Sequence, residues 1–402
     1  MTTYYVTTSG SDSNAGTSEG TAFATLGKAG SVALTSGDII YVKAGTYVLA
    51  TDTCDVSGGC MVLRKGVQVY GYESTPGDNC PTDNRPLFDA SGFTSFAGNV
   101  GLINWTNPFT SDDAVIVKNL HLLGVVYSDL TINPRPRAGF SGYGVWHPTA
   151  PTSNRGYNIL IENCIIEGFQ YGVEKNYLAQ TAHTGKVHRS ILRGCTRPAA
   201  DFGIASDCYI EANIRSGGFW QCYNCVIEFI GDGAFGTWAD GAVFAYDLTG
   251  CILINSGPST TCHGAELAGN AYGNIAIGFN TGYRTDAEGG TGVFSKCYSY
   301  GETTLVNHVL TTPNLLDDFI SLTQDPFVDS ANLDFTLNQT STANQELGTT
   351  TTDSNNVERA LNWYRLPVDH GSEQDAYYPF RWAASGSFQT DVLQLHPLRE
   401  NK

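Results

Sequence analysis

Asn163-Cys164-Ile165-Ile166 is the first of seven short segments, between residues 158 and 300, that align on one small residue followed in most cases by Ile, Val or Leu. The other six are Arg189-Ser190-Ile191-Leu192, Asp207-Cys208-Tyr209-Ile210, Asn224-Cys225-Val226-Ile227, Gly250-Cys251-Ile252-Leu253, Gly273-Asn274-Ile275-Ala276 and Lys296-Cys297-Tyr298-Ser299. The small residue recurs every 17 to 26 positions. This period is the length of one coil of a β-solenoid and is too variable for a helical repeat array. The sequence therefore predicts an all-β solenoid.

Length and composition agree with an elongated β chain. A solenoid adds coils without widening its core, so 402 residues fit one domain with end pieces. Hydrophobic residues make up 41% of the chain, charged residues only 15%, and 45 positions are Gly, which is typical of a packed β protein with many turns. No stretch approaches the roughly 20 apolar residues that cross a bilayer, so we expect no membrane span.

The net charge of −17 excludes one class of partner. Phosphate binding needs clustered Lys and Arg, whereas this chain has 39 acidic and 22 basic residues, so we expect no nucleic-acid partner. The acidic surface either serves solubility alone or makes attraction to an anionic polymer depend on a local basic patch.

The N-terminus runs from Met1 directly into an apparent strand at residues 4–6. It has no positively charged segment, apolar segment or cleavage site of a secretory signal peptide. We therefore expect a protein that is made in a cytoplasm and reaches the outside by another route, or one whose leader has been removed.

Eleven Cys is an odd number, so complete internal pairing is excluded. Cys54 and Cys60 either close a short disulfide loop or stay free, with Cys80 nearby. Cys222 and Cys225 form a C-x-x-C, but no second pair lies at zinc-ribbon spacing, so we expect no metal site there. Five others occupy the aligned small position and are expected to stack inside the coils as buried, reduced thiols: Cys164, Cys208, Cys225, Cys251 and Cys297.

The first 50 residues contain an ordered series of elements. They are an apparent strand at 4–6, a polar turn at 9–17, a short helix that begins near 23, and strands at 39–42 and 45–47. This series resembles the entry of right-handed parallel β-helix proteins of the pectate-lyase-like superfamily. The resemblance implies an all-β, single-stranded, right-handed parallel β-helix with a short N-terminal capping helix. The composition of the last residues adds an irregular aromatic C-terminal tail.

Four parts are predicted along the chain. Residues 1–50 form the cap and first coil, and 51–322 form the β-helix. Residues 323–356, which contain a line resembling the close of many such β-helices, form a closing coil and linker, and 357–402 form a C-terminal cap or attachment segment. Within the β-helix, residues 126–157 contain four Pro, which cannot donate to a strand ladder, so this segment is predicted to protrude as a long loop.

The strongest acidic group of the sequence lies after the segment of Cys225. Asp232 and Asp240 flank Trp238, and Glu266 lies in the next coil. Glycosidases need two carboxylates about 5 to 10 Å apart beside an aromatic platform for the sugar ring, so these residues are the candidate catalytic group, with Trp238 as platform. Alternatively, each Asp precedes a Gly and bonds only the backbone of its own turn.

Further candidates lie in the predicted loop and in the tail. Arg137 and Trp146 are candidate glycan-binding residues of the loop, where β-helices carry function. An aromatic cluster in the tail either caps the solenoid or forms an attachment surface: Trp363, Tyr364, Tyr377, Tyr378, Phe380 and Trp382. Lyases of the superfamily commonly use Ca²⁺ held by clustered Asp. That cluster is absent from the sequence, so we expect no metal and no cofactor unless the protein is a lyase.

Three hypotheses follow for the function. A β-helix without an export signal or a dense catalytic group favours a bacteriophage virion component, a tail spike, fibre or decoration protein without enzymatic activity. Such a protein would be made in the host cytoplasm and would contact other virion proteins and host or environmental glycans. Phage spikes of this shape are commonly homotrimers, although no coiled-coil heptad in this sequence supports one. The alternative is a secreted polysaccharide lyase or glycoside hydrolase that acts on acidic polysaccharide. The third is a structural adhesin that binds a protein through residues 357–402.

Overall fold

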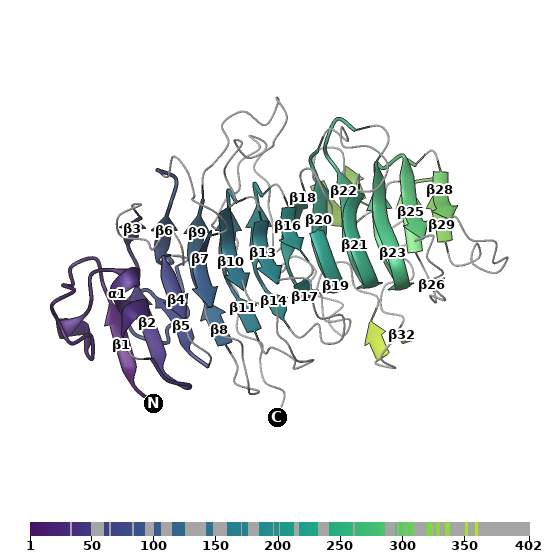
Figure 1. The fold of residues 1–402 in the computed structure, drawn as a ribbon. Coiled ribbons are helices and arrows are strands. Elements are labelled where there is room, and N and C mark those ends of the chain that lie inside the picture. Colours follow the sequence, from purple (N-terminus) through teal and green to yellow (C-terminus); the bar gives the residue numbers. More distant parts are fainter. Residues whose placement is uncertain are drawn as a thin grey trace.

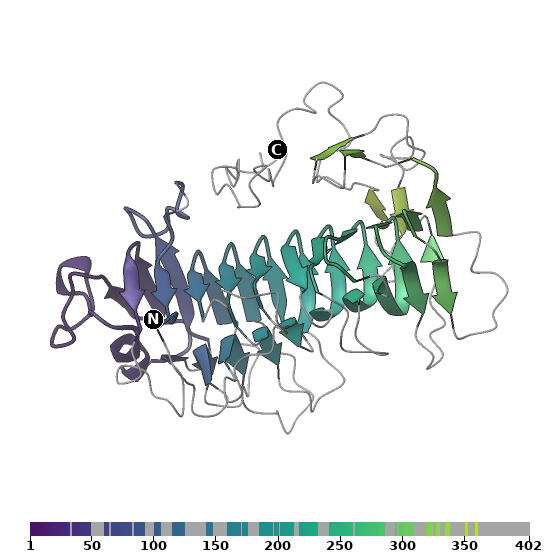
Figure 2. The same ribbon diagram turned by 90° about the horizontal axis from the view of Figure 1, so that it is seen from above.

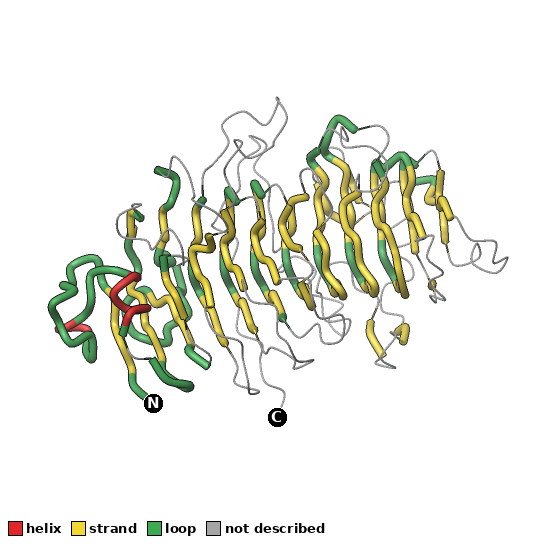
Figure 3. Tube along the Cα trace, viewed as in Figure 1, coloured by secondary structure: helices red, strands yellow, loops and turns green. Residues whose placement is uncertain are grey.

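The computed structural model describes residues 1–32, 34–49, 60–63, 66–82, 84–92, 100–105, 115–124, 142–147, 159–169, 171–175, 185–195, 197–200, 202–212, 217–231, 241–259, 262–285, 294–295, 297–302, 304–308, 319–324, 327–329, 334–337, 350–352 and 358–360. Figure 1 shows these residues as stacked coils along one axis. Strands make up nearly all of the regular structure, and helix is confined to the N-terminal end (Figure 3).

Three parallel sheets line the coils in the described part of the chain (Figure 2). Sheet A has 13 strands: β1 (Thr3–Val6), β2 (Ile39–Lys43), β5 (Gln68–Tyr72), β8 (Val115–Lys118), β11 (Ile159–Glu162), β14 (Lys186–His188), β17 (Phe202–Ser206), β19 (Gly217–Tyr223), β21 (Gly241–Thr249), β23 (His263–Tyr272), β25 (Thr281–Thr285), β28 (Thr304–His308) and, beside β23, β26 (Phe294–Ser295).

Sheets B and C complete the coils. Sheet B has 11 strands: β3 (Thr46–Val48), β6 (Leu87–Asp89), β9 (His121–Leu123), β12 (Ile165–Glu167), β15 (Ile191–Arg193), β18 (Tyr209–Ala212), β20 (Val226–Phe229), β22 (Ile252–Asn255), β24 (Ile275–Ile277), β27 (Cys297–Tyr300) and β29 (Phe319–Leu322). Sheet C has five: β4 (Met61–Leu63), β7 (Val100–Trp105), β10 (Gly142–His147), β13 (Tyr171–Lys175) and β16 (Arg197–Ala200). The chain is a right-handed parallel β-helix, as predicted.

The core lies inside the coils because alternate residues of each strand point inward. Val117, Ile161 and Val187 occupy one inward row of sheet A in direct register, and all three are buried. Their neighbours Lys118 and Glu162 point outward and form an ion pair between adjacent coils. Each coil thus repeats the inward positions of the coil before it.

The predicted capping helix is present at the N-terminal end. Helix α1 (Leu26–Ser31) begins after Thr25, whose side chain accepts a hydrogen bond from the backbone N–H of Lys28. Leu26 and Ala29 are buried against the first coil, so the helix covers core side chains that the open end of a solenoid would expose. A short 3₁₀ helix, η1 (Glu19–Thr21), precedes it.

The aligned small residues lie at the corner between sheets A and B. The residue before each of them, where the structure describes it, adopts a left-handed backbone conformation with φ between 47° and 63°, as does Asn119 one coil earlier: Asn119, Asn163, Arg189, Asp207, Asn224, Gly250 and Gly273. Asn, Asp and Gly accept this conformation at low cost. The corner therefore explains why the segments begin with these residue types.

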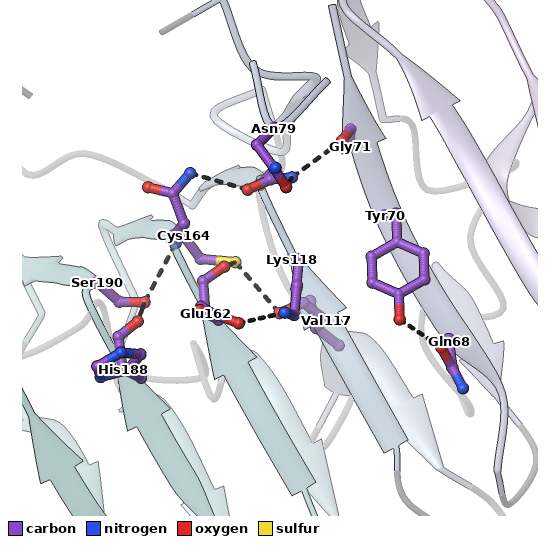
Figure 4. A network of polar contacts seen from close by, with 12 residues as sticks. Gln68, Tyr70, Gly71, Asn79, Val117, Lys118, Glu162, Cys164, His188 and Ser190 are labelled. Carbon is purple, nitrogen blue, oxygen red and sulfur yellow. Dashed lines mark hydrogen bonds and ion pairs between the residues drawn. The ribbon is translucent and has the colours of Figure 1, made fainter. Parts of the chain in front are cut away.

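Side chains of the small residues bond across coils, a role that their sequence pattern did not predict. The backbone N–H of Cys164 donates to Ser190 Oγ at 3.1 Å, as Figure 4 shows. In the same way the N–H of Cys225 lies 3.5 Å from Cys251 Sγ, and the N–H of Cys251 donates to Asn274 Oδ1 at 2.9 Å. The corner position thus needs a residue that is small and also accepts a hydrogen bond.

The cysteines of this ladder are buried thiols that form no disulfide, which confirms their predicted state: Cys164, Cys208, Cys225, Cys251 and Cys297. Burial raises the pKa of the Cys164 thiol to about 11, so it stays protonated at neutral pH. Cys80 is also free and buried, whereas Cys60 is disulfide-bonded. Cys54 lies outside the described residues.

Sheet B carries apolar side chains on its outer face as well as inside. Ile165, Ile191 and Tyr209 point away from the coil interior and pack on one another as a separate apolar cluster. Further along the same outer row, Ile275 and Tyr298 are completely buried. A sheet face of this composition is a packing surface, so a site for a polar ligand is better sought on sheet A.

In the coils after β16, the last strand of sheet C, a single long strand continues into sheet A. As a result β21 has nine residues and β23 has ten. Phe219 and Cys222 of β19 are both buried although they are three residues apart, so the strand turns a corner between them. Trp220 and Gln221 lie between them on the outside of this corner, and the pairing of β21 with β23 shifts by one residue there.

The prediction of a protruding loop at 126–157 is wrong for residues 142–147. Strand β10 occupies them and pairs in parallel with β7 and β13 in sheet C. The four Pro of the segment all flank this strand, so none of them interrupts its ladder. The rest of the segment lies outside the described residues.

Beyond β29 the described strands pair in antiparallel fashion. β30 (Phe327–Asp329) pairs with β31 (Asp334–Leu337), and β32 (Thr350–Thr352) pairs with β33 (Glu358–Ala360). Residues 361–402 of the predicted C-terminal segment lie outside the described residues. Within the described residues, no helix has the length and apolar character to cross a membrane.

Candidate functional site

Most of the site residues predicted from the sequence fall where the structure gives no description. Asp232, Trp238, Asp240 and Arg137 lie outside the described residues, as do the predicted attachment residues Trp363, Tyr364, Tyr377, Tyr378, Phe380 and Trp382. The backbone of Trp146 belongs to β10, in register with Glu174 of β13. Glu266 is the one predicted catalytic residue that the structure describes, and it lies in β23.

Glu266 is buried beside His263 on the same strand. Its Oε2 lies 3.8 Å from Nε2 of His263, and the side chains of Glu266 and His263 are only 7% and 8% exposed. A Cβ at Gly241 would lie 2.6 Å from two atoms of the His263 ring, so the start of β21, directly after Asp240, packs on that ring. Arg284 is the register partner of Glu266 in β25. The His263 ring thus lies next to both Glu266 and Gly241.

His263 is electrically neutral near pH 7. Burial, with a further contribution from the positive charge of Arg284, lowers the pKa of His263 to about 4. A separation of 3.8 Å is too long for a hydrogen bond, so the ring limits the space around Glu266 without bonding to it.

This low pKa predicts a pH-dependent stability. In the unfolded chain His263 binds a proton near pH 6.5, but in the folded protein only near pH 4, so stability is lost as the pH falls through this window. By pH 4 the loss from this residue amounts to about 3 kcal/mol. Between pH 7 and pH 4, the unfolding free energy of His263→Gln is expected to fall by about 3 kcal/mol less than that of the wild type. Guanidinium unfolding at the two pH values measures this difference. Equal losses in the two proteins would contradict this.

An exposed aromatic pair occupies the outer corner of sheet A. Trp220 and Tyr246 stack with ring centroids 4.4 Å apart and an interplanar angle of 4°. They are 37% and 39% exposed, in contrast to the buried aromatic side chains of the core. A Cβ at Gly269 would lie 2.8 Å from the Tyr246 ring, so the absence of a side chain there makes room for the stack in the next coil.

A hydrogen-bonded carboxylate lies directly beside the aromatic pair. Gln221 Nε2 donates to Asp247 Oδ2 and Asn270 Nδ2 donates to Asp247 Oδ1, each at 2.8 Å. The three residues form one outward row across β19, β21 and β23. Two amides from the neighbouring coils thus hold both carboxylate oxygens in place. The aromatic pair directly precedes this group in the sequence: Trp220 comes before Gln221 in β19, and Tyr246 comes before Asp247 in β21.

Thr249 adds an unused polar group to the same face. It lies two residues after Asp247 on β21, and both side chains point outward because successive strand residues alternate. Its hydroxyl is buried and has no hydrogen-bond partner in the part of the chain that is described. A buried hydroxyl without a partner is costly, so it is a candidate contact for a ligand.

A second polar group on sheet B is a structural ladder. Glu167 accepts from His121 Nε2 at 2.8 Å and from Arg193 Nε, and Glu211 accepts from the backbone N–H of Gly194 at 2.8 Å. Burial, followed by the charge of neighbouring Glu228, raises the pKa of Glu211. These contacts satisfy the charges across successive coils. Within the described residues, no group of three or more His, Cys, Asp or Glu side chains is arranged to hold a metal ion.

Comparisons with known proteins give structural likeness at low identity. No family model matches the chain, and no curated protein is similar to it in sequence. Among solved structures, pectate lyase Pel9A is 15% identical with a TM-score of 0.45, over 88% of this chain and 93% of that one. A rhamnogalacturonan lyase is 13% identical with a TM-score of 0.39, over 78% and 86%. A GH136 lacto-N-biosidase from Eubacterium ramulus is 10% identical with a TM-score of 0.41, over 80% and 66%.

These values carry no inference about activity. The fold assignment stands on the chain's own three parallel sheets, which define a right-handed parallel β-helix. What the protein does has to be argued from its own side chains.

The sequence interpretation missed the aromatic pair, Asp247 and its two amide partners. Trp220 and Tyr246 are 26 residues apart, which is the longest spacing of the small-residue repeat, so the repeat itself places them side by side. The signal was a residue pair, Trp-Gln and Tyr-Asp, that precedes an inward Cys or Leu in two successive coils.

Proposed function

We propose that the protein binds a polysaccharide across the outer corner of sheet A and hydrolyses it there as a glycoside hydrolase. One observation carries the proposal: an exposed aromatic stack, Trp220 and Tyr246, lies directly beside Asp247, whose carboxylate is fixed by two amides. Aromatic surface beside oriented carboxylates is the composition of a sugar site.

The aromatic pair supplies the apolar part of the site. Its exposed edges stand on the outer corner, where a chain of sugar rings can lie across several coils. Solvent-exposed Trp and Tyr usually serve recognition, because their rings offer a large rigid contact area at a low entropic cost. The open, elongated face of a β-helix suits a polymer better than a small molecule.

Two carboxylates provide the chemistry. Asp247 is fixed by Gln221 and Asn270 and suits a base that takes a proton from the attacking water. Glu266 is the second carboxylate and donates a proton to the leaving glycosidic oxygen. Its register partner, Phe244, lies three residues before Asp247 on β21, so the two carboxylates come from neighbouring coils beside the same corner. Inverting glycosidases use two such carboxylates with a water between them.

The disulfide at Cys60 supports a location outside the cytoplasm. Disulfides persist in oxidising compartments and are rare in the cytosol. A polysaccharide enzyme meets its polymer outside the cell, so the secreted alternative fits this bond better than folding in a reducing compartment.

Substitution of the fixed carboxylate tests the proposal. The wild-type protein is expected to release reducing ends from at least one polysaccharide of a broad panel, and Asp247→Asn is expected to lower the rate about a hundredfold or more, because the general base is lost. The measurement is a reducing-sugar assay of initial rates with each purified protein.

A matched control separates catalysis from general damage. Asp89→Asn replaces another outward Asp, which accepts hydrogen bonds from the backbone N–H and the hydroxyl of Ser91 in its own turn. It should hydrolyse at the wild-type rate. Equal rates for Asp247→Asn and the wild type would sink the proposal, as would the absence of reducing ends from every polymer tested with the folded protein.

The virion component, its partner proteins, the homotrimer and the protein-binding tail remain predictions from the sequence. No observation among the described residues favours them over a polysaccharide enzyme. Calcium as a cofactor of a lyase likewise remains a prediction.

A further inference from the structure

We propose that Thr249 determines the specificity of the outer corner of sheet A, because its hydroxyl binds a hydroxyl group of the sugar ring that rests on Trp220 and Tyr246. The inference rests on the proposed function and assigns a further binding residue to the same site. It selects a sugar ring with free hydroxyl groups on the edge that faces β21.

Thr249 lies beside the carboxylate of the site. It follows Asp247 by two residues on β21, so both side chains point outward from the coil. Each of the two residues is only 3% exposed. They lie at the same depth of this face, so a sugar edge that reaches Asp247 also reaches Thr249.

The hydroxyl of Thr249 is unsatisfied in the free protein. Its Oγ1 is buried and has no hydrogen-bond partner among the residues that the structure describes. A buried polar group without a partner carries the full cost of its desolvation. A sugar hydroxyl recovers this cost on binding, because each hydroxyl can both donate and accept a hydrogen bond.

Another hydroxyl in the same outward row does have a partner. Ser206, Tyr223 and Thr249 follow one another in direct register across β17, β19 and β21. Ser206 Oγ lies 2.8 Å from Nδ1 of His188 in the coil before it. Thr249 instead lies in register with the Tyr223 side chain, which is itself buried. The unsatisfied hydroxyl is therefore a property of this position and not of the row.

Kinetics of Thr249→Val and Thr249→Ser test the inference. Reducing ends are measured with mixed-linkage glucan, galactomannan, xylan, chitin oligomers and polygalacturonate, and the polymer that the wild type hydrolyses fastest is the probe. Thr249→Val should raise KM about five- to tenfold with kcat nearly unchanged, because it removes one hydrogen bond that holds the sugar. Thr249→Ser keeps the hydroxyl and should stay within about twofold of the wild type.

Stability gives a second readout, which a purely structural role of the hydroxyl would reverse. Thr249→Val removes an unsatisfied buried hydroxyl, so its midpoint of guanidinium unfolding should lie above that of the wild type. Thr46→Val is the matched control. Thr46 is exposed in β3 of sheet B, so this substitution should leave the kinetics unchanged.

The outcomes separate this inference from the proposed function. If the wild type hydrolyses a polymer and Thr249→Val has the same KM, Thr249 does not contact the sugar and only this inference fails. A lower unfolding midpoint of Thr249→Val would also overturn it, since the hydroxyl would then have a partner inside the protein. If the wild type releases no reducing ends from any polymer, the proposed function fails and this inference fails with it.

Discussion

Gly71→Ala is expected to destabilise the second coil by about 4 kcal/mol or more. Gly71 lies in β5, in register with Val42 of β2. A Cβ there would lie 2.9 Å from the carbonyl carbon of Asn119 and 2.9 Å from Cδ of Pro86, and closer still to the carbonyl oxygen of Asn119. These are backbone and ring atoms that cannot rotate away, so the coils themselves would have to separate.

Thermal and chemical unfolding, with hydrogen exchange, measure this effect. Because each coil of a solenoid contacts mainly its neighbours, the loss of protection should concentrate in β5 and β8 and spare the later coils. Gly20→Ala is the matched control, since a Cβ there meets nothing within 4 Å. If both variants unfold as the wild type does, the packing between the second and third coils is not as described.

Asn274→Leu is the second substitution with a large expected effect, a loss of about 3 to 6 kcal/mol. Asn274 is completely buried at the corner between sheets A and B. Its Nδ2 donates to the carbonyl of Leu248 and its Oδ1 accepts from the N–H of Cys251, each at 2.9 Å. Leu would leave both backbone groups without a partner inside the protein and would add volume to a packed corner.

Asn274→Ser provides the comparison, because Ser occupies the same position at Ser190 and there accepts from the N–H of Cys164. It should cost clearly less than Asn274→Leu in the free energy of unfolding measured with guanidinium. If Leu were tolerated as well as Ser, the hydrogen bonds of the corner would not explain the residue types of the repeat, and small size alone would suffice.

The fold could be predicted because the repeat is a property of single residues. The corner between sheets A and B needs a left-handed residue followed by a small one, and both leave a mark in the sequence in each described coil from Asn163 to Asn274. The capping helix was predictable for the same reason, since its N-cap and apolar face are local. Strand β10 was missed because four Pro around it suggested a loop, although none of them lies within residues 142–147.

The candidate site could be predicted only in part. Glu266 was identified because it follows an acidic segment by one coil, but Asp247 was not, since one Asp among outward residues has no pattern of its own. Its role depends on Gln221 and Asn270, which lie 26 residues before and 23 residues after it and meet it only through the coils. Trp220 and Tyr246 were missed because the strand turns a corner there and breaks the alternation that locates outward residues.

The most direct test of the central claim is a crystal structure of the protein with the oligosaccharide of the polymer that it binds most tightly. The account predicts a sugar ring against Trp220 and Tyr246, with its hydroxyls within hydrogen-bonding distance of Asp247 and Thr249. A sugar bound only elsewhere, for example on the outer face of sheet B, with the corner of sheet A open and empty, would contradict it.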